Sequence, residues 1–591
     1  MTGRPTAFKL ASVGRSARAI DVVVTSAAIA LVAAPLLRSN APLDLVNHLW
    51  IVWAAGKTFI QAGHPAFFIN TTTQGVFNPW FAFYGGTLYE LTGAISELIG
   101  HPYVAFAGVT VAAIAGAYVG TLSLGRQFGL RGLIAHAPAL SVVTSAYYIT
   151  DLYGRGAWTE FIALSAIPPL VASGVYLVGA PRWRPWPVAV FAVSAVILSG
   201  SHNITLLWSV TMGVAVLLVM RLALGHPQGH VYRRLAMVAG LGVLAGLVNS
   251  WFLITDVVYA RDVVASVTTT MPTGAVAAFD SASVLLDPFR TWPASSAFPS
   301  IYVQVPDWFL AWALAAGAML LWHHQASRGL RRVWVGGLLL VAVLLAIIVD
   351  NAVWSDVPYP FSQLQFPFRL NGYLLLVIGG VVLAGALALQ QARTFERRRR
   401  KLRNLQLSLI AVSVVSVGLC LWQQWEPSTS VPGYFVTRQS AFGSPNVLPS
   451  SWYAVDPYND TRAPIVAVPA GRVLTINPSQ VHGDRFAGWV DVPPGLEPIQ
   501  TNIAGGDYVV QISGLRRLGR NAAGFTVVGR LKKGRGRVHI VVQTAATGAI
   551  VIGSILSILA ILTLLAIVIY TTVRGRTTGR PTQADPSPSE A

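Results

Sequence analysis

The chain has 591 residues, of which 54% are hydrophobic and only 11% are charged, and its formal net charge is +19. About a quarter of the residues of a soluble globular protein are charged, so this composition excludes a water-soluble domain and a disordered chain. The single cysteine, Cys420, lies in an apolar run, which excludes a disulfide framework and a cysteine-based zinc site.

Apolar stretches recur along the whole chain, and crossing the hydrocarbon core of a bilayer takes about 20 such residues. We therefore predict an all-α polytopic membrane protein with about twelve transmembrane helices. The predicted spans are 20–37, 104–124, 133–149, 161–180, 187–200, 204–224, 235–257, 307–322, 333–349, 370–390, 405–422 and 547–573.

The stretch 81–99 is apolar but carries Glu90, Glu97 and a glycine pair, Gly85 and Gly86. If it crossed the membrane, most later basic loops would face outward. If it lies on the outer surface, these loops face the cytoplasm, as lysine and arginine loops do in membrane proteins. We therefore predict a surface-lying helix at 81–99 and cytoplasmic termini. The same distribution of basic residues argues against a nucleic acid partner.

The region 423–545 differs from the rest, because short β-branched runs alternate there with glycine and proline. This pattern predicts a small extracytoplasmic β-rich domain. The predicted organisation is a basic cytoplasmic tail (1–19), a transmembrane module (20–422) with a long first outer loop (38–103), the β-rich domain (423–545), a last transmembrane helix (546–573) and a disordered cytoplasmic tail (574–591).

Polar residues that could carry chemistry gather in the predicted outer loops. In the first loop, Asp44 and His48 lie one helical turn apart, and a carboxylate beside an imidazole can act as a base toward a hydroxyl. The alternative is that Asp44, which follows Pro42, only caps a helix. Lys57 and Tyr84 follow in the same loop, Tyr84 at the end of an aromatic run.

A second group lies between the third and fourth predicted spans, where Tyr153, Arg155 and Glu160 are close in sequence. Gly154 and Gly156 would let the backbone bend so that Arg155 points into a cavity. An ion pair between Arg155 and Glu160 that only closes the loop is the alternative, and the two interpretations can coexist.

Two further outer segments complete the set. His202 stands in a short turn, where a lone histidine is usually only interfacial. Gln365 and Arg369 flank a Phe-Pro-Phe sequence at the start of the tenth predicted span. A planar guanidinium suits a phosphate group, which it can bind through two hydrogen bonds. The sequence contains no Walker loop, no HExxH motif and no histidine or cysteine pair with metal-ligand spacing.

In this order, these segments resemble the polytopic glycosyltransferases of the GT-C class, most nearly the prokaryotic branch often labelled as related to 6-pyruvoyl-tetrahydropterin synthase. The resemblance covers about 20–390. It implies that Asp44 is the catalytic carboxylate and that a sugar carried on a polyprenyl phosphate is the donor. Members often carry paired acids, whereas Leu43 and Leu45 flank Asp44, so we expect no required cofactor; a divalent cation stays open.

These expectations define a mechanism at the extracytoplasmic face of a bacterial plasma membrane. Asp44 with His48 would activate an acceptor hydroxyl on a cell-envelope glycan or glycolipid. Five residues would hold the leaving lipid phosphate, and three others would orient the site. The predicted phosphate-binding residues are Arg155, Arg369, His202, Tyr153 and Lys57, and the predicted orienting residues are Glu160, Gln365 and Tyr84.

Two other functions fit the same spans. One is a transporter or flippase for lipid-linked sugars, although such proteins commonly pair broken helices at the bilayer midplane, and here the polar groups gather toward one face. The other is a non-catalytic envelope scaffold that binds glycan through 423–545.

Overall fold

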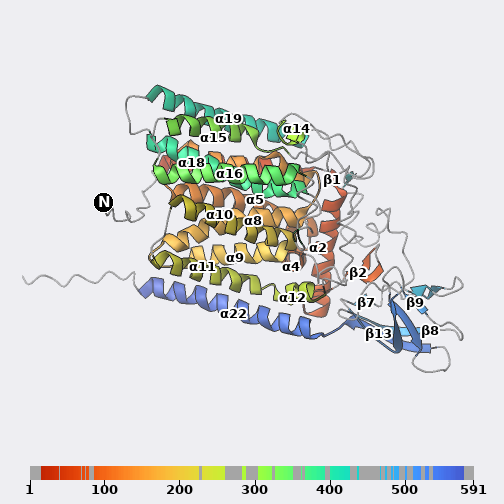
Figure 1. Ribbon diagram of the computed structural model, residues 1–591. Helices are drawn as coiled ribbons and strands as arrows, with labels where there is room; N and C mark the ends of the chain where they lie inside the picture. Colours follow the sequence, from red (N-terminus) through yellow and green to blue (C-terminus); the bar gives the residue numbers. More distant parts are fainter. Residues whose placement is uncertain are drawn as a thin grey trace, which may run out of the picture.

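The protein is described by a computed structural model in which long helices lie side by side and the strands of the C-terminal region gather at one end (Figure 1). The described residues are 15–38, 40–67, 69–72, 75–78, 85–224, 229–259, 282–287, 304–322, 327–350, 358, 361, 367–392, 399–425, 435–437, 466–467, 473–474, 481–482, 485–491, 499–501, 510–520, 526–530 and 537–577.

Helices follow one another along most of the described chain, with short 3-10 turns between some of them. They are α1 (Arg15–Ala33), η1 (Ala34–Leu37), α2 (Leu43–Ala62), α4 (Gly86–Ile99), α5 (Pro102–Gln127), η2 (Leu133–His136), α6 (Ala137–Val143), α7 (Ala146–Tyr153), α8 (Trp158–Gly179), α9 (Pro185–Ser201), α10 (Asn203–Leu224), α11 (Gly229–Leu247), α12 (Ser250–Tyr259), α14 (Ala282–Leu285), α15 (Asp307–Trp322), α16 (Arg328–Val349), η6 (Pro367–Leu370), α18 (Asn371–Ala392), α19 (Arg399–Trp425) and α22 (Gly548–Thr577).

The chain is a multi-pass helical membrane protein, as predicted. Within the described ranges, 8 helices are long and apolar enough to cross a membrane, and the number reaches 10 if each of two bent helix pairs is one span. The shorter apolar helices α9 and α15 coincide with the two remaining predicted stretches. Every predicted stretch thus matches a helix or a bent pair, while the number of twelve crossings stays a prediction.

Helix α4 lies within the stretch 81–99, for which we predicted a surface position; residues 81–84 lie outside the described residues. In the part of the chain that the structure describes, α4 is not among the helices long and apolar enough to span. It packs against α2 and α5, and α2 runs crosswise over one end of the long helices (Figure 1). Together α2 and α4 cover that end of the bundle.

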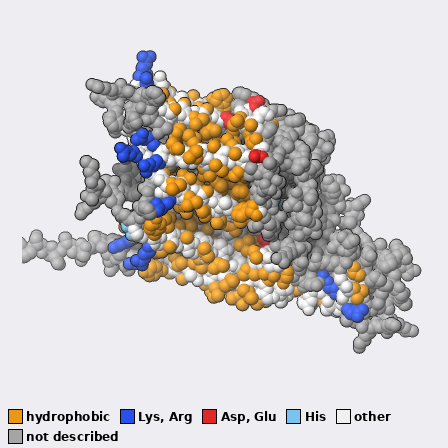
Figure 2. Space-filling model, in the orientation of Figure 1, with side chains coloured by type: hydrophobic (Ala, Val, Ile, Leu, Met, Phe, Trp, Pro, Cys, Tyr) orange, Lys and Arg blue, Asp and Glu red, His pale blue; other side chains and the backbone are white. Residues whose placement is uncertain are grey.

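Charge is distributed unevenly along the long helices. On the face shown in Figure 2, Lys and Arg side chains gather at one end, apolar side chains cover the middle, and Asp and Glu side chains appear toward the other end, where α2 lies. The arginines that open α16 belong to the basic end. This arrangement matches the separation of basic and acidic loops on which the predicted topology depends.

Two helix pairs are bent near the end that α2 covers. Helices α6 and α7 meet at 46° and helices α11 and α12 at 80°. The first break has a local cause, because the Ser145 side chain accepts a hydrogen bond from Tyr148 N–H and so starts a new helix at α7. The break matters for the site, since α7 and the turn after it carry several of its polar residues.

The interior is built from small and apolar residues on α5, α8 and α18, of which α8 and α18 are the most buried. At Gly120 of α5, an added Cβ would lie 2.4 Å from the backbone nitrogen of Pro169 in α8. Only a glycine permits this approach. Gly120 therefore serves helix packing, as small residues between neighbouring helices typically do.

Strands form four small antiparallel sheets in the described chain. The paired strands β2 and β3 lie between α2 and α4 in the sequence, β1 pairs with β4, and the others form sheets in the orders β10-β13-β8-β7 and β11-β12-β9-β5-β6. The strands are β1 (Asn40–Pro42), β2 (Ile69–Thr72), β3 (Gly75–Asn78), β4 (Phe435–Thr437), β5 (Val466–Ala467), β6 (Val473–Leu474), β7 (Val481–His482), β8 (Arg485–Asp491), β9 (Ile499–Thr501), β10 (Val510–Ser513), β11 (Leu515–Arg520), β12 (Thr526–Arg530) and β13 (Arg537–Thr544).

Strands β4 to β13 all fall inside the predicted range 423–545. The pairing of β1 with β4 joins the residues just before α2 to the beginning of this region, with Ala41 opposite Val436. The predicted tails fall mostly outside the described residues, which begin at residue 15 and end at residue 577.

Candidate functional site

A buried cluster of charged and hydroxyl side chains lies where α7, α8 and η6 meet. Arg155 donates through Nη1 to Asp151 Oδ1 at 2.7 Å and to the Tyr147 hydroxyl at 3.0 Å. The Tyr147 hydroxyl in turn donates to Glu160 Oε1 at 2.8 Å. Arg369 Nε lies 3.3 Å from Glu160 Oε2, and Arg155 Nη1 lies 3.5 Å from the same oxygen. Glu160 therefore faces both arginines.

Helical spacing explains half of this cluster. Tyr147, Asp151 and Arg155 follow one another at intervals of one helical turn, so they share a face where α7 ends. The chain then turns sharply at Gly156, which has φ +76°, and enters α8. Gly154 has φ −96°, a value open to any residue. Our expectation of two bending glycines is thus correct for Gly156 only.

The other half comes from the start of α18, far away in sequence. Pro367 opens η6, which places Phe368 and Arg369 beside the α7–α8 turn. The guanidinium of Arg155 lies 5.2 Å from the centre of the Phe368 ring, within the range of a cation–π contact. The arginine is thus held between an aromatic face and two carboxylates.

Burial distinguishes the acids of the cluster from the arginines. The side chains of Asp151 and Glu160 are 0% and 3% exposed, whereas those of Arg155 and Arg369 are 10% and 13% exposed. The carboxylates thus hold the guanidinium groups from the interior, and the arginines form the more accessible side of the cluster. A buried charge is tolerated only when it is paired in this way.

His202 lies at the turn between α9 and α10, and the charges of this cluster affect its pKa. Its Nδ1 accepts a hydrogen bond from Thr205 N–H at 3.1 Å, so in the neutral ring the proton is on Nε2. Burial lowers the pKa of His202 to about 4; the Glu160 charge opposes this and the two arginines add to it. His202 is therefore a neutral hydrogen-bond donor at physiological pH.

His48, on the buried face of α2, is near enough to His202 for their charges to interact. Its Nδ1 is 2.5 Å from the hydroxyl of Tyr89 in α4, and its ring centre is 6.2 Å from that of Trp158 in α8. Burial, together with the nearby His202, lowers the pKa of His48 to about 3. The crosswise helix α2 is thereby linked to the N-terminal end of α8, two residues before Glu160.

Asp44 lies in the first turn of α2, one turn before His48. The N-cap of α2 is Pro42, with φ −57° and ψ 145°, so the alternative in which Asp44 caps the helix is wrong. The side chain of Asp44 lies outside the described residues, and so do Tyr84 and Gln365.

The structure places two predicted phosphate-binding residues apart from the cluster. Lys57 pairs with Glu97 of α4 at 2.8 Å on the exposed side of α2. The hydroxyl of Tyr153 donates to the carbonyl of Val32 in α1 at 2.8 Å. Both residues tie helices together through these contacts, and we leave them out of the site.

Tyr89, Tyr147 and Asp151 belong to the site but were not among the residues predicted for it. For Tyr147 and Asp151 the sequence does hold a signal, because both precede Arg155 at whole-turn spacing. For Tyr89 we find no such signal, since its contact with His48 depends on how α4 packs against α2.

Among the residues that the structure describes, no group of three or more His, Cys, Asp or Glu side chains is arranged to hold a metal ion. The cluster instead combines two cations, two carboxylates, a tyrosine hydroxyl and two neutral imidazoles. Such a set can hold an anion and position a hydroxyl-bearing substrate.

Comparison with known proteins finds likeness in structure only. No family model and no curated protein matches the chain. A cryo-EM structure of the arabinofuranosyltransferase AftD from mycobacteria has a TM-score of 0.42 and 16% identity, covering 71% of this chain, which spans 28% of that one. A crystal structure of the Archaeoglobus fulgidus oligosaccharyltransferase in the apo form has a TM-score of 0.32 and 10% identity.

The oligosaccharyltransferase match covers 74% of this chain, which spans 59% of that one. We derive the function from the residues of the site alone.

Proposed function

We propose that the protein is a membrane glycosyltransferase that moves a sugar from a polyprenyl-phosphate donor to a hydroxyl of a cell-envelope glycan or glycolipid. The observation that carries the proposal is the convergence of Arg155 and Arg369 on one oxygen of Glu160, with His202 in the same electrostatic neighbourhood. Distant segments of the chain thereby form one site beneath α2.

The charges suit a leaving phosphate. A sugar linked to a prenyl phosphate is a phosphodiester with one negative charge, and departure of the sugar leaves a second charge on the phosphate. Fixed cations that face this developing charge in a site shielded from water lower the barrier. Arg155 and Arg369 form the accessible side of the cluster, and the neutral His202 would donate through Nε2 to a phosphate oxygen.

Asp44 is the proposed base. The acceptor oxygen attacks the anomeric carbon from the side opposite the phosphate, and its proton passes to the Asp44 carboxylate. The bond from carbon to phosphate oxygen breaks, and its electron pair stays on the phosphate, so the anomeric centre is inverted. His48, one turn along the same face of α2 and bonded to Tyr89, would orient the acceptor as a neutral imidazole.

The proposed site faces away from the cytoplasm. In Figure 2 the basic side chains gather at the end of the bundle opposite α2, and lysine and arginine favour the cytoplasmic side of membrane proteins. His48 on α2 then belongs to the extracytoplasmic side. Because the cluster gathers near that end rather than along the midplane, it favours an enzyme over a transporter.

The test is sugar transfer by the purified chain in proteoliposomes, with a panel of radiolabelled polyprenyl-phosphate sugars and an envelope glycan fraction as acceptor. We expect Asp44→Asn to lose a factor of about 100 to 10 000 in rate, the usual contribution of a general base. We expect Arg369→Lys to lose a factor of about 10 to 100, since a hydrogen bond to a charged group contributes about 1.5–3 kcal/mol.

Two matched controls are Asp350→Asn and Arg182→Lys, both at exposed positions outside the site; each should keep the activity of the parent protein. Full activity of Asp44→Asn would remove the proposed base. Transport of the labelled lipid without sugar transfer would establish the flippase instead. Glycan binding through 423–545, with no transfer from any donor, would establish the scaffold.

A further inference from the structure

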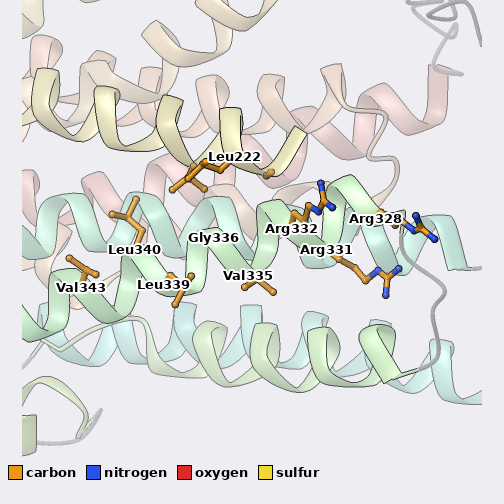
Figure 3. Close-up of a pocket in the computed structure, with 11 residues that line it drawn as sticks. Leu222, Arg328, Arg331, Arg332, Val335, Gly336, Leu339, Leu340 and Val343 are labelled. Carbon is orange, nitrogen blue, oxygen red and sulfur yellow. The ribbon is translucent and has the colours of Figure 1, made fainter. Parts of the chain in front are cut away.

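An apolar groove lies between α10 and α16, at the end of the bundle opposite α2. Its volume is about 660 Å³. In Figure 3 three arginines stand at one end of the groove, and apolar side chains follow along α16. The lining residues are Val219, Leu222, Ala223, Arg328, Arg331, Arg332, Val335, Gly336, Leu339, Leu340 and Val343.

The floor of the groove is a close helix contact. An added Cβ on Gly336 of α16 would lie 2.4 Å from Val219 Cγ1 of α10, so the two helices touch there. The walls, in contrast, are open: Leu222 is 79% exposed and Leu339 is 62% exposed. Both helices are candidate spans, so these side chains face the hydrocarbon of the bilayer. The groove is therefore shaped for a hydrocarbon chain.

The arginines form one charged rim at the mouth of this groove. Arg328, Arg331 and Arg332 lie within the first turns of α16, at spacings that place them on neighbouring positions of one helix face. Cations at a helix N-terminus oppose the helix dipole, and α16 has no acidic residue in its first turn. Their position therefore does not stabilise α16. It places three cationic side chains beside the apolar groove.

We propose that this groove binds one anionic glycerophospholipid from the leaflet at the basic end of the bundle. An acyl chain would lie along Leu222, Leu339 and Val343, and the headgroup phosphate would meet the arginine rim. Basic pockets between transmembrane helices bind anionic headgroups in this way. The tendency of arginine to occupy cytoplasmic loops accounts for basic residues at this end, but not for their convergence on an apolar groove.

The test is lipid binding by the full chain, purified and reconstituted in nanodiscs of phosphatidylcholine that contain a small fraction of phosphatidylglycerol. Native mass spectrometry of the released protein counts the retained lipids. We expect one retained phosphatidylglycerol. Because each arginine near an anionic lipid contributes a factor of about 5, the double variant Arg331→Gln/Arg332→Gln should weaken its retention about 25-fold.

Two further variants separate the parts of the site. Leu339→Trp fills the apolar groove while it keeps all three arginines, and it should also weaken retention. The matched control Arg182→Gln/Arg184→Gln removes the same charge at exposed positions that do not line the groove, and it should retain the lipid as the parent does. Sugar transfer is not part of this measurement, so its result is independent of the proposed enzyme activity.

Several results would overturn the proposal. Equal weakening in both double variants would show attraction to charge without a site. Equal retention of phosphatidylcholine would show a groove that does not select the headgroup. Competition by free glycerol phosphate at equal affinity, or no effect of Leu339→Trp, would show that the apolar groove takes no part.

Discussion

Glu160 is the carboxylate that faces both arginines of the site that we describe. Its Oε1 accepts from Tyr147, and its Oε2 faces Arg155 and Arg369. Since these four residues come from α7, the turn after it, α8 and η6, one carboxylate links four segments of the chain. The proposed phosphate site depends on it without requiring that Glu160 touch the substrate.

We predict that Glu160→Gln destabilises the protein by about 3 kcal/mol, the cost of removing one partner from a buried ion pair. Two buried guanidinium groups would then face a single carboxylate, Asp151. The midpoint of thermal unfolding in detergent, followed by tryptophan fluorescence, measures this effect. The control is Glu97→Gln, which breaks the more exposed pair with Lys57 and should cost at most about 1 kcal/mol. Equal losses in the two variants would contradict the assigned role.

His48 and His202 predict a pH dependence of stability. Burial lowers their pKa values to about 3 and about 4, from 6.5 in the unfolded chain. Between pH 6.5 and about 4 the unfolded chain therefore binds protons that the folded protein does not. The stability that these groups contribute is complete above pH 6.5 and is lost as the pH falls through this window.

Thermal unfolding midpoints, measured from pH 7 to pH 4, test this dependence. We expect His202→Gln to flatten the fall of the midpoint with decreasing pH. His230→Gln, at an exposed position on α11, should leave the slope of the parent protein unchanged. A parent protein whose midpoint does not fall in this window would show that the histidines are not buried as described.

At the scale of elements, glycines determine how closely the helices pack. Gly120 meets the backbone of Pro168 and Pro169 in α8, whereas Gly116, one turn earlier on α5, has no atom closer than 3.9 Å to its added Cβ. Likewise, an added Cβ on Gly56 of α2 would lie 2.5 Å from the carbonyl oxygen of Gly93 in α4. The second contact keeps α2 against α4 and so keeps His48 against Tyr89.

We predict that Gly120→Ala destabilises the protein by about 1–3 kcal/mol, because the new methyl group meets backbone atoms that cannot rotate away. Gly116→Ala on the same helix should be neutral or stabilising by up to about 1 kcal/mol, since alanine favours helix over glycine. The midpoints of thermal unfolding of the two purified variants, each compared with the parent protein, test this difference. Equal effects would mean that α5 and α8 are farther apart than described.

At the scale of the whole molecule, the separation of charge predicts which end faces the cytoplasm. Cys420, the single cysteine of the sequence, is buried, so a Cys420→Ser background allows labelling at chosen sites. A membrane-impermeant maleimide added to intact cells should label Gln61→Cys at the end of α2. It should label Arg184→Cys, at the basic end, only after the membrane is permeabilised. The reverse pattern would invert the proposed topology and move the site to the cytoplasmic side.

The sequence by itself determined the class of the protein and the positions of its apolar helices. Hydropathy and charge are properties of contiguous residues, so the apolar helices and the strand-rich region after α19 could be read before any contact was known. The prediction that the helix in 81–99 does not cross the membrane came from its acids and from the charge of the loops around it. The order of the polar motifs gave the GT-C-like expectation in the same local way.

Only the tertiary structure decided which polar residues meet. Nothing in the neighbourhood of Arg369 specifies that it faces Glu160, that Tyr89 reaches His48, or that Lys57 and Tyr153 turn to Glu97 and Val32. Nor does any single helix contain the groove between α10 and α16. Such pairings depend on how helices far apart in sequence pack, and packing is fixed by close contacts such as that of Gly120 with Pro169, whose partners lie on different helices.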